Sequence, residues 1–175
     1  GECMTHPVGV RSPEHEELAR ELFLRLSAAP DECPKDVVYK DPKQTAVAHP
    51  GEIPAALLDF ARQALEKALA EPLALERALG ETLSDPKPGV WFEPADDFGL
   101  IENVRLNQRT RMLYDAQHIF INGESYLAAG RDAELMRQLA DTRQLSSAEV
   151  QQLSDDALQL LSSWVDAGWA HSTAG

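Results

Sequence analysis

Metal or nucleophilic chemistry in this sequence would have to use its histidine, cysteine and acidic side chains. The five histidines are scattered along the chain: His6, His15, His49, His118 and His171. A zinc-protease motif would need a second histidine three residues after His15-Glu16, and none is there. An iron site built on an H-x-D pair has no match either. The sequence therefore predicts no metal site of its own.

The usual nucleotide and acyl-transfer motifs are also missing. There is no P-loop, G-x-G-x-x-G or G-x-S-x-G, and no two of the ten glycines are spaced as G-x-G. The only cysteines, Cys3 and Cys33, do not form a C-x-x-C pair. We therefore expect reduced thiols rather than a disulfide scaffold or a zinc knuckle, and no catalytic residue is assigned.

Acidic residues dominate the charge, with 29 Asp and Glu against 16 Lys and Arg and a net charge of −13. This charge repels phosphate backbones and disfavours a nucleic-acid-binding domain. The one basic cluster is Arg105, Arg109 and Arg111, which is either a solvated strand face or a contact for an acidic or nucleic-acid partner. No apolar run approaches the roughly 18 residues of a membrane span. We expect a cytoplasmic protein that binds neither membranes nor DNA.

The first half of the chain predicts three helices. Ser12-Pro13 marks the start of the first, since serine caps helices and proline suits the first helical position. Pro54 and Pro72 begin the other two, and leucines and alanines follow one face of each. These faces form either the core of an antiparallel bundle or a dimer interface. We predict a homodimer through helices 54–84.

The second half combines a hairpin with helices. The strand-like segments 118–121 and 124–127 flank Asn122-Gly123, a dipeptide typical of a type I′ turn with positive φ at both residues. The other predicted elements are a short helix over 98–104, helices over 132–141 and 147–153, a last helix capped by Ser154 and ended by Gly168, and a strand over 169–171. This order predicts a winged-helix-like unit.

The first residues raise a separate expectation. The segment Cys3–Val10 has the pattern of a strand, yet no preceding chain is there to pair with it. We therefore expect the sequence to be a fragment of a larger sheet domain.

Several segments together resemble one family. CMTHPVGVRSP, followed by an amphipathic helix, resembles the last strand of the JmjC/cupin barrel in bacterial ribosomal oxygenases. The connector ending in AHPGEIP, the hairpin HIFINGESY and the closing LLSSWVDAGW are similar to that family's region beyond the barrel. The resemblance implies a mostly α fold with small β elements: a remnant barrel strand at 1–12, a helical dimerisation region at 13–90 and a winged-helix-like domain at 91–175.

Members of this family are Fe(II)- and 2-oxoglutarate-dependent dioxygenases that hydroxylate an arginine of a large-subunit ribosomal protein. The resemblance implies that this chain is the C-terminal part of such an enzyme, that the iron ligands lie upstream of Gly1, and that the part is inactive alone. Cys3 and Thr5 share a strand face that would either border the 2-oxoglutarate pocket or pack inside the barrel. His6-Pro7 departs from the family's aromatic and small residues, and the proline removes a donor from the strand ladder.

Two other functions stay open at this point. One is a stand-alone protein-binding or scaffold protein with a winged-helix-like domain, and the other is a DNA-binding regulator. The net charge opposes the regulator, as do Asp155, Asp156 and Asp166 on the predicted recognition helix. A ribosomal protein, being basic, would suit the acidic surface as a partner.

Overall fold

The computed structural model describes residues 14–27, 38–40, 42, 49, 51–94 and 101–173. The chain divides into two compact units, Gly1–Ala74 and Leu75–Gly175. The strand expected at 1–12 lies outside the described residues. No helix in the described ranges is long and apolar enough to cross a membrane. The domain limits expected at residues 12 and 90 stay predictions.

The described part of the first unit contains two helices, α1 (His15–Ser27) and α2 (Ala55–Ala70). In α1 Glu16 and Glu17 stand in the first turn and Arg25 in the last, which suits the helix dipole. Helix α2 ends at Ala70, and the next residue, Glu71, adopts an extended backbone because a proline follows it. Neither helix buries a single residue.

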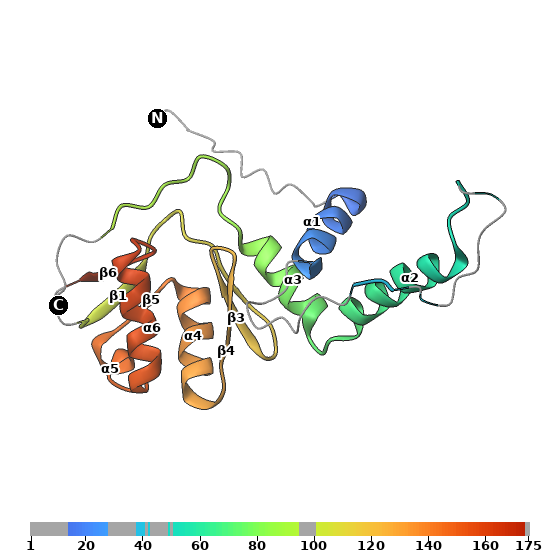
Figure 1. The fold of residues 1–175 in the computed structure, drawn as a ribbon. Coiled ribbons are helices and arrows are strands. Elements are labelled where there is room, and N and C mark those ends of the chain that lie inside the picture. The colour runs from blue at the N-terminus through green and yellow to red at the C-terminus, as the bar shows by residue number, and fades with distance from the viewer. Residues whose placement is uncertain are drawn as a thin grey trace. The chain divides into compact units, whose positions relative to one another are not determined.

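The second unit contains two antiparallel three-stranded sheets, with strand orders β5-β1-β6 and β2-β3-β4 (Figure 1). Its elements are α3 (Ala74–Ser84, all but the first residue in this unit), β1 (Asn103–Leu106), β2 (Met112–Tyr114), β3 (His118–Ile121), β4 (Glu124–Leu127), α4 (Gly130–Thr142), β5 (Gln144–Leu145), α5 (Ser147–Val150), α6 (Asp155–Asp166) and β6 (Ala170–Thr173). The order confirms the expected winged-helix-like unit, mostly α with small β.

Helices α4 and α6 run beside each other and supply much of the core (Figure 1). The helical spacing predicts that Leu158 and six further residues face inward. Leu158 is only partly buried, and the other six are buried: Leu135, Met136, Leu139, Leu161, Trp164 and Val165. All four residues of β3 are buried as well, because both faces of this central strand are covered. Ile119 and Ile121 belong to the core, and the Phe120 ring lies against Gly80 of α3.

The hairpin turn and the limits of α6 also agree with the sequence. Asn122 and Gly123 have φ angles of 48° and 91°, so both are in the positive region expected for this two-residue turn. Ser154 caps α6 by accepting the Ala157 N–H at 3.3 Å. Gly168 follows the helix at a φ of 74°, and the next N–H, that of Trp169, bonds back to the Trp164 carbonyl at 2.8 Å.

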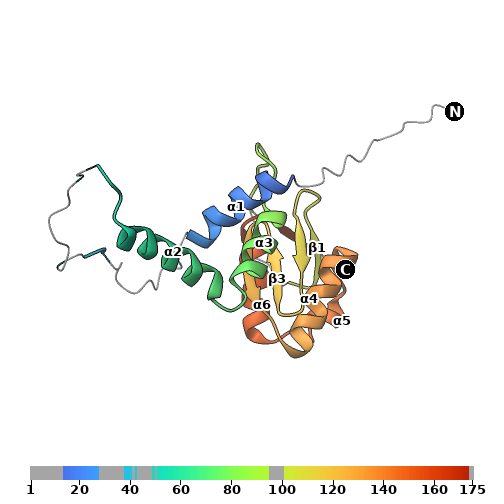
Figure 2. The ribbon, with the colours of Figure 1, turned by 90° about the vertical axis from the view of Figure 1, so that its right-hand side faces the viewer.

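Two expectations differ from the structure. Residues 103–106 form strand β1 rather than the end of a helix, because β1 pairs with β5 on one edge and β6 on the other. The sequence predicts that α3 forms a bundle with the two helices before it. In the structure α3 packs against the hairpin of β3 and β4 (Figure 2). Gly80 permits this packing, since a Cβ there would lie 2.2 Å from Cζ of Phe120.

Candidate functional site

The residues expected to border a cofactor pocket, Cys3 and Thr5, lie outside the described residues, as do His6 and Cys33. His15, His49 and His171 are exposed and far apart in sequence. Within the described ranges there is no group of three His, Cys, Asp or Glu side chains that could hold a metal ion. The described residues therefore offer no ligand set for Fe(II), and no chemical step is assigned to that ion.

Two arginines of the basic cluster have a structural role that the sequence did not reveal. The Nη1 of Arg109 donates to the Trp91 carbonyl at 2.9 Å, and the Nη1 of Arg111 donates to the Asp85 carbonyl at 2.7 Å. Arg143 acts in the same way, donating through Nη2 to the carbonyls of Asn107 and Thr110. Arginine suits this task because its donors are fixed in a planar fork.

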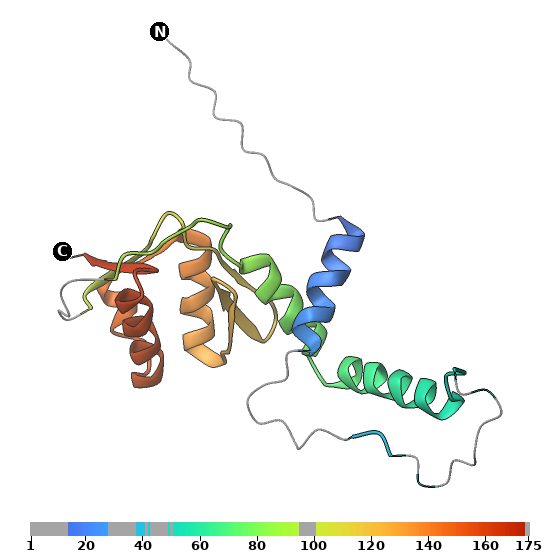
Figure 3. The same cartoon turned by 45° about the horizontal axis from the view of Figure 1, so that its top comes forward.

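The two arginine contacts fasten residues 85–94, a segment that we call the strap. The strap leads from α3 toward β1 and β6 (Figure 3). Its Phe92 ring packs edge to face on Trp169 with 6.4 Å between the centroids. The Glu93 carbonyl passes so close to Gly168 that a Cβ on this glycine would lie 2.1 Å away. The strap is thus packed against the rest of the second unit.

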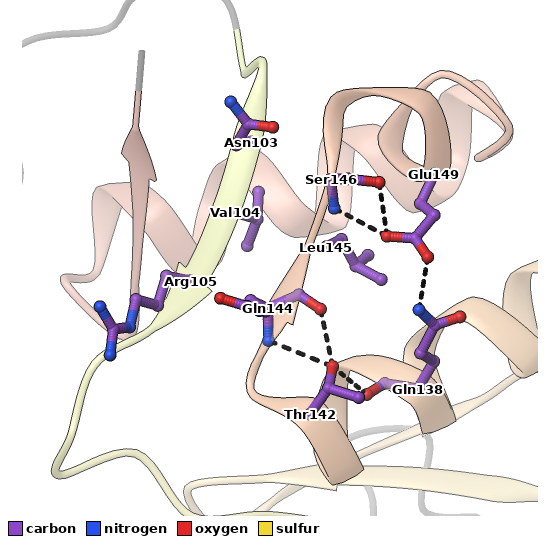
Figure 4. Close-up of a pocket in the computed structure, with 9 residues that line it drawn as sticks. All are labelled: Asn103, Val104, Arg105, Gln138, Thr142, Gln144, Leu145, Ser146 and Glu149. Atoms are coloured by element: carbon purple, nitrogen blue, oxygen red, sulfur yellow. Dashed lines mark hydrogen bonds between the residues drawn. The ribbon is translucent and has the colours of Figure 1, made fainter. Parts of the chain in front are cut away.

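A groove of about 590 Å³ opens beside the sheet that contains β1 (Figure 4). Most of its lining side chains are polar, and they come from β1, α4, β5 and the start of α5: Asn103, Val104, Arg105, Gln138, Thr142, Gln144, Leu145, Ser146 and Glu149. Its value as a binding site depends on whether these polar groups are available to a ligand.

The only carboxylate in the groove is fully engaged. Glu149 accepts the backbone N–H and the hydroxyl of Ser146, both at 2.7 Å, and also a hydrogen bond from the Gln138 amide. The backbone N–H of Ser146 is the main reason that the pKa of Glu149 lies below its ordinary value. Glu149 therefore stays ionised and caps α5, which makes it a poor general base.

The outer edge of β5 is closed in a similar way. The hydroxyl oxygen of Thr142 lies 2.8 Å from the carbonyl oxygens of both Gln138 and Gln144. The side chain of Asn103 accepts the N–H of Ser147 at 2.7 Å. Figure 4 draws Asn103, Gln138, Thr142 and Gln144. These bonds fasten α4, β5 and α5 to β1. The side chains that hold these elements together are Asn103, Gln138, Thr142, Ser146 and Glu149.

A histidine–aspartate pair lies at the other sheet. His118 is buried on β3, and its Nδ1 is 3.1 Å from the carboxylate of Asp115. That carboxylate also accepts the N–H groups of Gln117 and His118, each at 2.7 Å. Burial alone would raise the pKa of Asp115, but these hydrogen bonds outweigh it and hold the pKa below its ordinary value. The pair closes the loop between β2 and β3. The bond from the Gln117 N–H to Asp115, two residues earlier, is a turn that aspartate commonly forms, so the residue type alone could have indicated it.

A second depression of about 610 Å³ has alanine-rich walls and Arg137 at one side. The guanidinium lies over the Tyr114 ring, 5.9 Å from its centroid, and donates to the Ala116 carbonyl at 2.9 Å. The Tyr114 hydroxyl donates to Asp141 at 3.0 Å, and this bond raises the pKa of Tyr114. Arg137, the arginine beside this depression, is thus held by contacts within the second unit.

The hairpin tip and helix α6, the kinds of element that read DNA in many winged-helix proteins, are respectively covered and acidic here. The turn at the tip of the hairpin is covered by α3, since the Gly123 N–H donates to Ser84 Oγ at 3.1 Å and Ser125 donates to Glu81. Helix α6 presents Asp155 and Asp156 to solvent. A covered wing and an acidic helix both oppose contact with a phosphate backbone.

The comparisons with known proteins agree with this architecture. The model of the ROXA-like winged helix family matches residues 64–171. No curated protein matches the sequence. A solved structure of the ribosomal oxygenase YcfD from Escherichia coli is similar with a TM-score of 0.67 and 20% identity, covering 93% of this chain and 47% of that one.

Two further YcfD structures are similar in the same way. One, in complex with cobalt and succinic acid, has a TM-score of 0.67 at 20% identity and covers 91% of this chain and 46% of that one. The other, in complex with cobalt and 2-oxoglutarate, has a TM-score of 0.65 at 18% identity with the same coverage of 91% and 46%. The chain thus spans a little under half the length of the structures it resembles, and the likeness is one of fold.

Proposed function

The chain belongs to the ROXA-like winged helix family, and on that premise we propose that it is the non-catalytic portion of a ribosomal oxygenase. The whole enzyme would use Fe(II) and 2-oxoglutarate to hydroxylate an arginine of a ribosomal protein in the cytoplasm. The observation that carries the proposal is the family match over 64–171, supported by the shared fold with the E. coli ribosomal oxygenase.

Two observations on the described residues support a non-catalytic role for this portion. They offer no metal-binding cluster, and the carboxylates beside the sheets, Asp115 and Glu149, are both occupied by backbone N–H groups. This portion would therefore assemble the enzyme and present the substrate, while the oxidation takes place elsewhere in the full-length protein.

We expect the first unit to supply the homodimer contact, within the region of helices 54–84. Leu58, Leu65 and Leu69 recur on one face of α2, and each is more than half exposed, at 56%, 57% and 52%. Phe23 and Leu24 of α1 are exposed to a similar degree. Apolar faces of this kind on a helix that buries nothing indicate a surface that a second copy covers.

Sedimentation of the purified chain tests the dimer. We expect a dimer at concentrations of tens of micromolar and its dissociation by Leu65→Glu, because a charge buried without a partner is costly. Gln63→Glu is the matched control, since it adds the same charge to α2 about 200° around the helix from Leu65. A monomeric unmutated chain, or equal dissociation by both variants, would contradict the proposed interface.

Two assays test the enzymatic assignment. The chain alone should form no succinate from 2-oxoglutarate with added Fe(II), and turnover that depends on the chain would refute the non-catalytic role. The gene upstream of the Gly1 codon should encode an H-x-D pair and a later histidine in the same reading frame. A start codon and ribosome-binding site directly before Gly1 would favour a stand-alone binding protein.

Binding measurements test the partner. Because acidic residues outnumber basic ones 29 to 16, we expect basic ribosomal proteins to associate quickly at low salt and more slowly as salt screens the attraction. Random duplex DNA should not bind. Micromolar DNA affinity with a steep salt dependence would show that counterion release operates and that this part of the proposal is wrong.

A further inference from the structure

The hairpin turn contains the dipeptide in which an asparagine side chain is most open to attack by the following backbone nitrogen, because glycine has no side chain to shield it. In that reaction Gly123 N bonds to Cγ of Asn122, and the side-chain nitrogen leaves as ammonia. Water then opens the succinimide ring to aspartate or isoaspartate. We infer that Asn122-Gly123 is a latent deamidation site that α3 keeps closed.

The attacking nitrogen is occupied in the folded unit. Gly123 N donates its proton to Ser84 Oγ at 3.1 Å. Ser84 is fully buried, and its own hydroxyl donates to the Glu81 carbonyl at 3.2 Å, which leaves an oxygen lone pair for Gly123. Base must remove the Gly123 proton before attack, and the buried serine of α3 shields that proton from solvent.

The side chain under attack is held as well. Asn122 is 8% exposed, and its Oδ1 accepts the N–H of Arg111 at 3.0 Å. The Asn122 N–H in turn donates to the Arg111 carbonyl at 3.0 Å. Ring closure needs Cγ of Asn122 to approach Gly123 N, so the turn would have to leave this geometry and break these bonds.

The site therefore reacts when the hairpin separates from α3. Isoaspartate inserts an extra carbon into the backbone, and either product places a negative charge where Asn122 is now buried. A two-residue turn between Ile121 and Glu124 cannot take the extra backbone carbon without losing its geometry, and the buried charge is costly to desolvate. Opening of the unit would thus leave a permanent covalent mark at Asn122.

The test follows deamidation of the full chain by peptide mass mapping in mildly alkaline buffer, with and without urea. We expect Asn122 to gain about one dalton at least several-fold more slowly in the native chain than in the unfolded one. Ser84→Ala should accelerate the native rate several-fold. Thr82→Ala on the same helix is the control, because Thr82 Oγ1 makes no hydrogen bond and its loss leaves the Ser84–Gly123 bond in place.

Equal rates in native and unfolded chains would overturn the inference, and so would an unchanged rate in a Ser84→Ala variant that circular dichroism shows to be folded. If Ser84→Ala does not fold, amide hydrogen exchange of the unmutated chain decides the matter. The Gly123 amide should be protected to the level of the core strands, and rapid exchange at this position would contradict the role of α3.

Discussion

The two units start from the same kind of sequence pattern and reach different degrees of burial. Helices α1 and α2 have apolar residues at helical spacing, yet bury none of them. Helices α4 and α6 have similar spacing and place Leu139 and Leu161 in the core at 0% exposure. This difference in burial shows that an amphipathic pattern identifies the apolar face of a helix but not the surface that covers that face. In the second unit the cover is two sheets of the same unit, whereas in the first we propose a second chain.

The largest expected effect contrasts the two leucine environments. Leu161→Ala removes a fully buried side chain and should lower the free energy of unfolding of the second unit by about 2–5 kcal/mol. Leu65→Ala on α2 should leave that unfolding unchanged. Urea denaturation followed by tryptophan fluorescence reports the second unit, since the three tryptophans, Trp91, Trp164 and Trp169, all lie in it. Equal losses of unfolding free energy in the two variants would contradict the difference in burial between α2 and α6.

A smaller effect tests whether the strap belongs to the packed unit. Gly168→Ala puts a Cβ at a φ of 74° and against the Glu93 carbonyl, so the strap must move. Gly89 has a φ of 82°, and an added Cβ would meet nothing within 4 Å. Gly89→Ala should therefore lower stability only through backbone strain, by about 1–2 kcal/mol. Thermal unfolding should show the greater loss for Gly168→Ala. Similar losses for the two variants would mean that the strap lies loosely on the unit.

The hairpin provides the next test. Asn122→Val forces a β-branched residue into positive φ and removes the bond to the Arg111 N–H, so we expect a loss of about 1–3 kcal/mol. Asn122→Gly keeps the backbone geometry and loses only the side-chain bond, so its cost should be smaller. The two variants can be ranked by urea midpoint, and the reverse ranking would exclude positive φ as the dominant constraint.

The smallest effect is in the pH dependence of the second unit. The pKa of Asp115 is lowered in the folded state, so its contribution to stability is complete above the unfolded pKa and is lost as the pH falls through the folded value. Asp115→Asn keeps an oxygen that can accept hydrogen bonds but does not titrate. We expect a slightly shallower decline of the urea midpoint in acid for this variant, and an identical decline would show that Asp115 does not contribute.

Local signals in the sequence predicted much of the second unit. Asn122-Gly123, the Ser154 cap and Gly168 each act through their own backbone and nearest neighbours, so their geometry can be read from residue types. Strand β1 was missed because its four residues become a strand only through pairing with β5 and β6. Long-range partners of this kind leave no trace in local periodicity.

The candidate site could be predicted less well than the fold. Arg109 and Arg111 form a basic cluster in sequence, but their hydrogen bonds go to carbonyls at Trp91 and Asp85, and a carbonyl carries no residue-specific signal. The occupation of Glu149 depends in part on Gln138, eleven residues away. Cys3 and Thr5 lie outside the described residues, so their place beside a 2-oxoglutarate pocket stays a prediction.

The pairing of β1 with β6 has a consequence for how this unit is synthesised. Arg105 pairs with His171, so β1 leaves the ribosome long before its partner strand does. The hairpin of β3 and β4 needs only neighbouring residues and can close early. Until β6 emerges, β1 offers an unpaired edge that another nascent chain could join. A slow translation step or a truncation before residue 170 should therefore favour aggregation over a partly folded domain.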